Sequence, residues 1–197
     1  HLLDHPDAAP AHREFLAADH NDPRPEFCRQ LWESIRDCAS IVHYSSFEKT
    51  QLKAMVQDGI PFAEDLLSAM GECAVDLETI IKEHVYFEGF KGRSSIKVVL
   101  PTLVPSLSYS NLAIGDGHAA AAAFRKMLAP GTPASEAAEI RRSLLEYCCQ
   151  DTLAMVERQT MRDAGAAIMR ADEEALVPQH AHHLGHVLRH RTLGIGH

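Results

Sequence analysis

Apolar residues recur at helical spacing through most of this chain and at strand-like spacing in a few short stretches. Asp22 followed by Pro23 is typical of a helix start, and Phe27, Leu31 and Ile35 then fall on one helical face. The other patterns predict strand-like segments at 2–3 and 13–16, a buried strand over 40–44, and helices over 46–56, 62–70, 75–85, 94–100, 115–128 and 136–169. Short strands that alternate with helices indicate the α/β class.

The composition is that of a globular domain with a core, or of a domain with a tail. The chain has 197 residues, of which 46% are hydrophobic and 23% are charged. It lacks an apolar run near 18 residues, so we expect neither a transmembrane helix nor a membrane partner. Its five cysteines lack C-x-x-C spacing and are expected to be reduced thiols of a cytoplasmic protein. We expect no secretory signal, and because the sequence begins without methionine we expect it to be a fragment.

The net charge of −8 argues against a protein that coats nucleic acid through a general basic surface. It leaves a nuclease possible, because bound metal ions supply positive charge locally. Candidate chemistry lies in LLEYCCQDTLAM, where Tyr147 and Asp151 stand four residues apart and share a helical face. A carboxylate there could hold a divalent metal ion while the phenol orients a water molecule. The spacing is common by chance, and it gains weight from the segment IVHYSSFEKTQL, which carries His43 and Glu48.

These two segments, in this order, resemble the motifs of the DEDD (DnaQ-like) 3′–5′ exonucleases. The second motif of those enzymes, roughly H-N-x-x-[FY]-[DE], is similar to the stretch from His43 to Glu48, with Tyr44 in place of Asn and Glu48 in place of the usual Asp. The third motif of the tyrosine subtype, Y-x-x-x-D, matches Tyr147 and Asp151. The span 13–156 resembles still more closely an uncharacterised bacterial domain-of-unknown-function family of that superfamily, through phrases such as REFLA, HYSSFE, VDL, SSIKVVLPTLVP and SYSNLAI.

The resemblance implies a ribonuclease H-like fold over residues 1–170, with three layers in which helices flank a mixed central sheet. It does not extend to residues 171–197, whose histidine-rich composition predicts a flexible tail. It further implies two Mg²⁺ or Mn²⁺ ions held by carboxylates, which are hard oxygen ligands. Glu48 and Asp151 would be metal ligands, and Tyr147 would orient the attacking water. When either acid is considered alone, an exposed helical carboxylate is the more frequent role.

Further site residues follow from the same resemblance. Lys97, with Ser94 and Ser95 at a helix N-terminus, would contact a phosphate of the nucleic acid, although a surface lysine is the commoner role. His43 is a candidate substrate contact, although a packed or hydrogen-bonded histidine is the favoured interpretation at a strand end. Asp76 is expected to be a helix cap rather than a metal ligand.

One motif of the family is missing, and its absence leaves two classes of function open. The D-x-E sequence of the first, central strand would fall before His1, so this chain holds half of the metal ligands and lacks that strand. If an upstream D-x-E exists, we expect a metal-dependent 3′–5′ exonuclease; without it, we expect a non-catalytic module that binds nucleic acid or protein. In the tail, His182, His186 and His190 repeat every four residues, for which adventitious metal affinity is the favoured interpretation over a dedicated zinc site.

Overall fold

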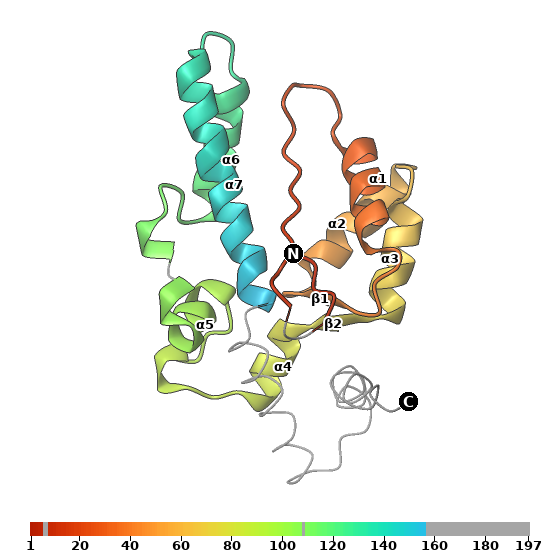
Figure 1. Cartoon of the computed structure of the whole chain (residues 1–197), viewed down its shortest axis with the longest axis vertical. Helices are drawn as coiled ribbons and strands as arrows, with labels where there is room; N and C mark the ends of the chain where they lie inside the picture. The colour runs from red at the N-terminus through yellow and green to blue at the C-terminus, as the bar shows by residue number, and fades with distance from the viewer. Residues whose placement is uncertain (6–7, 108, 157–197) are drawn as a thin grey trace.

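The structure, a computed structural model, describes residues 1–5, 8–107 and 109–156, and in that range helices surround two short strands (Figure 1). The predicted helix beyond residue 156 and the His-rich tail lie outside the described residues. The elements are α1 (Arg24–Ile35), β1 (Ile41–His43), α2 (Phe47–Gln57), α3 (Ala63–Glu72), β2 (Ala74–Asp76), α4 (Leu77–His84), η1 (Glu88–Phe90), α5 (Ile96–Leu103), η2 (Pro105–Leu107), η3 (Tyr109–Asn111), α6 (Gly117–Leu128) and α7 (Ala134–Val156).

The two strands form a parallel pair, which confirms the mixed α/β class in a mostly helical chain. In this register Ile41 lies opposite Ala74 and His43 lies opposite Asp76. A parallel pair needs a crossover connection, because the chain must return to the end of the sheet at which the first strand began before the second strand can start. Helices α2 and α3 supply that crossover.

The first hydrophobic core lies among α1, α2 and α3. It contains Cys28, Leu52, Ala63, Leu66 and Met70, and the apolar face of α1 predicted from the sequence packs against it. Leu66 and Cys28 are fully buried. The apolar residues at helical spacing in this half of the chain therefore lie on the helix faces that pack together. This packing removes apolar surface from water.

The second core lies among α5, α6 and α7, where α6 and α7 form a long antiparallel hairpin (Figure 1). Its buried members include Val99, Leu100, Met127, Leu144 and Tyr147. A third, smaller cluster connects this helical layer to the strands: Leu77 and Ile80 of α4 pack with strand residues Val42 and Val75 and with Met155 of α7. Helix α7 therefore crosses directly beside β1.

Several sequence-based predictions about local structure were wrong. The strand-like segments at 2–3 and 13–16 are not strands: Leu2 and Ala11 form a single antiparallel bridge, and 13–16 has no regular structure. Strand β2 was missed, because residues 75–76 were assigned to the start of a helix. Ser46 and Ser95 stand at helix N-termini, but their side chains make no capping hydrogen bond to the described residues. Ser135 lies inside α7, which begins one residue earlier.

Candidate functional site

The first sequence motif begins at the carboxyl end of β1, and the helix that carries the second motif contacts this strand. His43 ends β1 and lies opposite Asp76, which ends β2, so the segments that follow them leave the sheet at the same edge. Helix α7, which carries Tyr147 and Asp151, contacts β1. Ligand sites in sheets of parallel strands commonly lie outside the carboxyl ends of the strands.

His43 is a buried histidine with one hydrogen-bonded ring nitrogen. Its side chain is almost inaccessible, and its Nδ1 lies 2.7 Å from the carbonyl oxygen of Ser45. Because a carbonyl only accepts, Nδ1 carries the hydrogen and donates it. Nε2 is buried and has no hydrogen-bond partner among the described residues. In the neutral ring, Nε2 therefore holds an unused lone pair, and the predicted hydrogen-bonded histidine is confirmed.

Glu48, in the first turn of α2, has one buried carboxylate oxygen. Its Oε2 makes no hydrogen bond to the described residues and lies 3.9 Å from Nδ1 of His43. The side chain as a whole is 43% exposed, so only part of the carboxylate is removed from water. Burial raises the pKa of Glu48, and the negative charge of Asp76 adds to this effect, while the backbone N–H of Glu48 itself and the nearby His43 oppose it. Burial therefore destabilises the ionised form of Glu48.

Asp76 holds the turn after β1 to the start of α4. Its Oδ1 accepts hydrogen bonds from the backbone N–H groups of Glu78 and Ser45, both at 2.9 Å. The first bond caps α4, which confirms the predicted helix cap. The second bond stabilises Ser45 in the left-handed region at φ 76°, which a serine rarely adopts. Asp76 therefore shapes the segment that leads from His43 to Glu48.

Asp151 accepts a hydrogen bond from one tyrosine and is influenced by a second. The Tyr109 hydroxyl donates to Oδ1 of Asp151 at 2.5 Å, and the Tyr147 hydroxyl also favours the ionised carboxylate. Burial nevertheless raises the pKa of Asp151, against the opposing effect of both hydroxyls and of Lys97. Burial and the nearby carboxylate raise the pKa of Tyr147 to about 12 and shift that of Tyr109 upward as well. Both phenols are therefore protonated donors at neutral pH.

Lys97 lies beside Tyr109 and Tyr147. Its Nζ lies 5.2 Å from the ring centroid of Tyr147 and 6.0 Å from that of Tyr109, within the range of cation–π attraction. Its charge also lowers the pKa of Asp151. The predicted phosphate-contacting lysine thus lies beside the predicted tyrosine and carboxylate.

The two serines near Lys97 have different surroundings. The Ser94 hydroxyl donates to Oε1 of Glu78 at 2.9 Å, and its carbonyl accepts from the Tyr44 hydroxyl. Ser95 is exposed at the N-cap of α5. Because the Ser94 hydroxyl already donates to Glu78, Ser95 is the better placed of the two to meet a phosphate.

Two polar clusters therefore lie near Tyr44. One holds His43, Glu48 and Asp76, and the other holds Lys97, Tyr109, Tyr147 and Asp151. Tyr44 packs against the core that contains Tyr109 and Tyr147, and burial raises its pKa, with a further contribution from the charges of Glu78 and Asp76. Glu48 and Asp151 do not belong to a shared group of three or more potential ligands in the described range.

Tyr109 was not predicted as a site residue. It lies in the phrase SYSNLAI, but it belongs to no motif with a fixed spacing to Asp151, and 42 residues separate the two. Only the pairing in space reveals its role.

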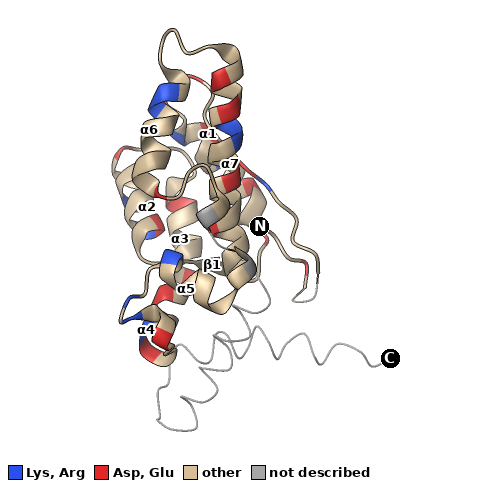
Figure 2. Ribbon diagram, turned by 90° about the vertical axis from the view of Figure 1, so that its left-hand side faces the viewer, with Lys and Arg blue, Asp and Glu red and all other residues tan. Residues whose placement is uncertain are grey.

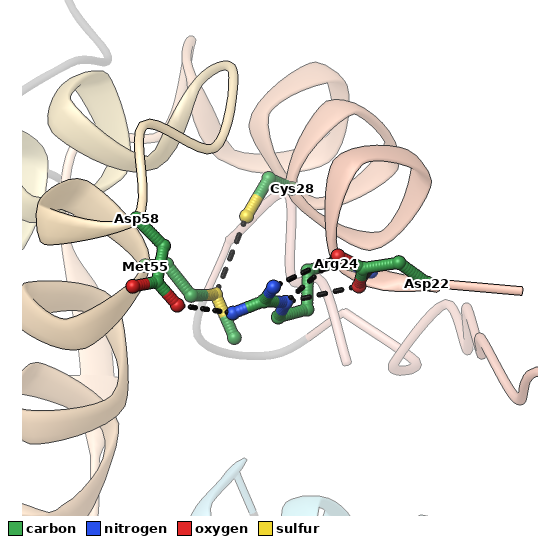
Figure 3. Close-up of polar contacts among 5 residues, drawn as sticks. All are labelled: Asp22, Arg24, Cys28, Met55 and Asp58. Carbon is green, nitrogen blue, oxygen red and sulfur yellow. Dashed lines mark hydrogen bonds and ion pairs between the residues drawn. The ribbon is translucent and has the colours of Figure 1, made fainter.

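Charge on other helices of the described range is mixed in sign or confined to a few residues. Figure 2 shows basic and acidic residues together on the visible parts of α4 and α7, whereas the charged residues of α6 are Arg125 and Lys126 in its last turn. A mainly apolar groove of about 340 Å³ is lined by residues of the N-terminal segment, α1, α2 and α6, with Arg24 at its wall. Arg24 donates to Asp58 at 2.5 Å and to Asp22 at 2.8 Å (Figure 3). Two carboxylates thus neutralise this guanidinium.

Comparison with known proteins gives one family. A family model described as a domain of unknown function (DUF2779) matches residues 1–95. The matched part includes β1, His43, Glu48 and β2, and it ends before α5 and α7. No curated protein and no solved structure matches the chain. Across the described residues, no helix is both long enough and apolar enough to cross a membrane.

Proposed function

We propose that this chain forms part of a divalent-metal-dependent nuclease that hydrolyses phosphodiester bonds from a 3′ end. The observation that carries the proposal is the buried Oε2 of Glu48, which has no hydrogen-bond partner among the described residues, together with the contact between β1 and α7, the helix that carries Tyr147 and Asp151. The order of the two motifs along the chain supports the same conclusion.

The two carboxylates suit a hard divalent cation. Burial raises the pKa of both Glu48 and Asp151, so each ionised carboxylate is destabilised where it lies and would be stabilised by a nearby positive charge. Oxygen ligands of this kind favour Mg²⁺ or Mn²⁺. When bound, such ions would polarise the phosphate and supply an activated water. The sequence contains two of the four carboxylates of the exonuclease motifs, so a D-x-E pair from an additional strand is part of this proposal.

The surrounding side chains would position the substrate and the water. Tyr147, with a pKa of about 12, keeps its proton at neutral pH and therefore orients a water as a hydrogen-bond donor rather than as a base. The ammonium of Lys97 would attract the scissile phosphate, and Ser95 would add a hydroxyl at the start of α5. His43 would accept a hydrogen bond from the substrate through the lone pair on Nε2.

The finer fold assignment belongs to the same proposal. The parallel pair β1–β2 with its helical crossover suits one part of a ribonuclease H-like sheet, with helices on its faces. A strand that carries D-x-E and pairs beside β1 and β2 would enlarge this two-stranded pair into the mixed sheet that we expect.

Calorimetric titration with Mn²⁺ tests the metal site, and a nuclease assay tests the reaction. We expect Asp151→Asn to weaken Mn²⁺ binding at least tenfold, whereas Glu146→Gln, an exposed acid on the same helix, should leave it unchanged. Both variants keep the histidine tail, so binding there cancels in the comparison. The nuclease assay uses 5′-labelled DNA and RNA with the protein as its gene encodes it, including any D-x-E strand. Metal-dependent shortening from the 3′ end, lost in Asp151→Asn, is expected; intact substrate under all conditions would refute the proposal.

A non-catalytic binding module is the alternative function. It is favoured by the Tyr109 hydroxyl that already donates to the Asp151 carboxylate, which suits a structural role. Retention of labelled DNA or RNA without cleavage, unaffected by Asp151→Asn, would support this alternative.

A further inference from the structure

We propose that His1, His12 and Cys149 form a second metal site, which binds Zn²⁺ or a similar transition-metal ion. One ligand atom of each residue lies within 4.8 Å of the others, and the rings of His1 and His12 have centroids 4.6 Å apart. The site is independent of the carboxylates in the proposed nuclease centre.

The N-terminal segment explains how residues 1 and 12 meet. Leu2 and Ala11 form an antiparallel bridge with two hydrogen bonds of 2.9 Å, so His1 and His12 stand as the next pair along this short ladder. Residues directly opposite each other in antiparallel pairs have neighbouring side chains. Cys149 approaches this pair from α7, with its Sγ 3.8 Å from Nε2 of His1.

The hydrogen bonds of His1 leave the correct nitrogen available for a metal. The Thr152 hydroxyl donates to the backbone carbonyls of Cys148 and Cys149, both at 3.2 Å. Its oxygen lies 2.9 Å from Nδ1 of His1, so it accepts the hydrogen of Nδ1. In this neutral ring the lone pair is on Nε2, which lies near the cysteine sulfur. Metal-binding histidines are commonly oriented by a hydrogen bond from their other nitrogen in this way.

His12 has a comparable arrangement. Its Nε2 lies 3.0 Å from Oε2 of Glu14, so this carboxylate accepts the hydrogen of Nε2. The lone pair on Nδ1 is then available to a metal ion. His12 is exposed, while His1 and Cys149 are partly buried, so the site opens to solvent and can also take a water.

The distances and ligand types favour zinc over magnesium. A tetrahedral ion with Zn–N near 2.0–2.1 Å and Zn–S near 2.3 Å separates nitrogen from sulfur by about 3.6 Å. The observed 3.8 Å between His1 Nε2 and Cys149 Sγ requires only a small adjustment. Imidazole and thiolate ligands suit Zn²⁺, Co²⁺ and Cu⁺, whereas Mg²⁺ prefers oxygen. The bound ion would cross-link the N-terminal segment to α7, the helix that carries Tyr147 and Asp151.

Cobalt absorption spectroscopy on the reduced full-length chain tests the site. Co²⁺ bound to a thiolate gives a sulfur-to-cobalt charge-transfer band, which histidines of the tail cannot produce. We expect this band in the wild type, its displacement by Zn²⁺, and its loss in Cys149→Ser. Cys148→Ser is the matched control, because Cys148 is the exposed neighbour outside the cluster, and it should keep the band.

A second variant keeps the test decisive if Cys149→Ser fails to fold. His12→Asn alters an exposed side chain and should weaken Co²⁺ affinity at least tenfold as judged from the thiolate band, whereas His118→Asn, also exposed, should not. Absence of the band in the wild type, or an equal band in Cys149→Ser, would overturn the proposal. Neither result depends on nuclease activity or on Mg²⁺.

Discussion

Replacing Tyr109 with phenylalanine isolates the hydrogen bond that connects η3 to α7. The variant removes one hydroxyl and keeps the ring, which lies 6.2 Å from the ring of Tyr147 between centroids and is tilted by 54°. Tyr109 is only 8% exposed, so water cannot readily replace the missing donor. Asp151 keeps the favourable effects of the Tyr147 hydroxyl and of the Lys97 charge on its ionised form.

The expected loss of stability follows from the charge on the acceptor. A hydrogen bond to an ionised group contributes about 1.5–3 kcal/mol, and a neutral one about 0.5–1.5 kcal/mol. Because the Tyr147 hydroxyl and the Lys97 charge still favour the ionised form of Asp151, we expect Tyr109→Phe to lower the free energy of unfolding by about 1.5–2 kcal/mol at pH 7. Below the pKa of Asp151 the carboxyl is neutral, and the loss should fall below about 1 kcal/mol.

The stability of the wild type and that of Tyr109→Phe should depend on pH in the same direction. The pKa of Asp151 is raised in the folded state, so the native protein binds this proton more tightly than the unfolded chain does. Stability from this group is therefore greatest below the usual aspartate pKa and decreases as pH rises through the folded value. Removal of the Tyr109 donor raises that pKa further, so the variant should lose more stability over the same rise in pH.

Urea denaturation at pH 7 and pH 4 measures these differences. Tyr86→Phe is the matched control, because Tyr86 is 83% exposed and its hydroxyl should matter by less than about 0.5 kcal/mol. If Tyr109→Phe behaved like this control at pH 7, or lost the same stability at both pH values, the Tyr109–Asp151 bond would not act as described.

Three further predictions concern other parts of the structure. Glu48→Gln should raise the melting temperature at pH 7 and change little near pH 4, because it removes a carboxylate whose pKa burial raises; a lower melting temperature at pH 7 would contradict this. Asp76→Ala should cost about 2–3 kcal/mol in urea denaturation, since it removes the cap of α4 and the bond to Ser45, while Asp37→Ala, an exposed acid, should cost little. Leu66→Ala should cost about 2–5 kcal/mol by the same measurement, because Leu66 is fully buried, and a loss under 1 kcal/mol would show that the α1–α3 core is not packed as described.

The sequence by itself determined the helices and their buried faces. The apolar spacing of Phe27, Leu31 and Ile35 predicted α1, and Asp76 was identified as a helix cap, because these signals depend on neighbours within one or two turns. The start of α7 was predicted within two residues, and Tyr147 and Asp151 share one face of it. Local hydrogen bonding and side-chain burial along one element are encoded within that element.

Only the tertiary structure decided how distant segments pair. Strand β2 has three residues, and its sequence shows no strand pattern of its own; its hydrogen bonds to β1 define it. The donor from Tyr109 to Asp151 and the approach of His1 to Cys149 likewise join residues that are 42 and 148 positions apart. Such contacts depend on the packing of α7 against the rest of the chain, and a spacing rule along the sequence contains no information about that packing.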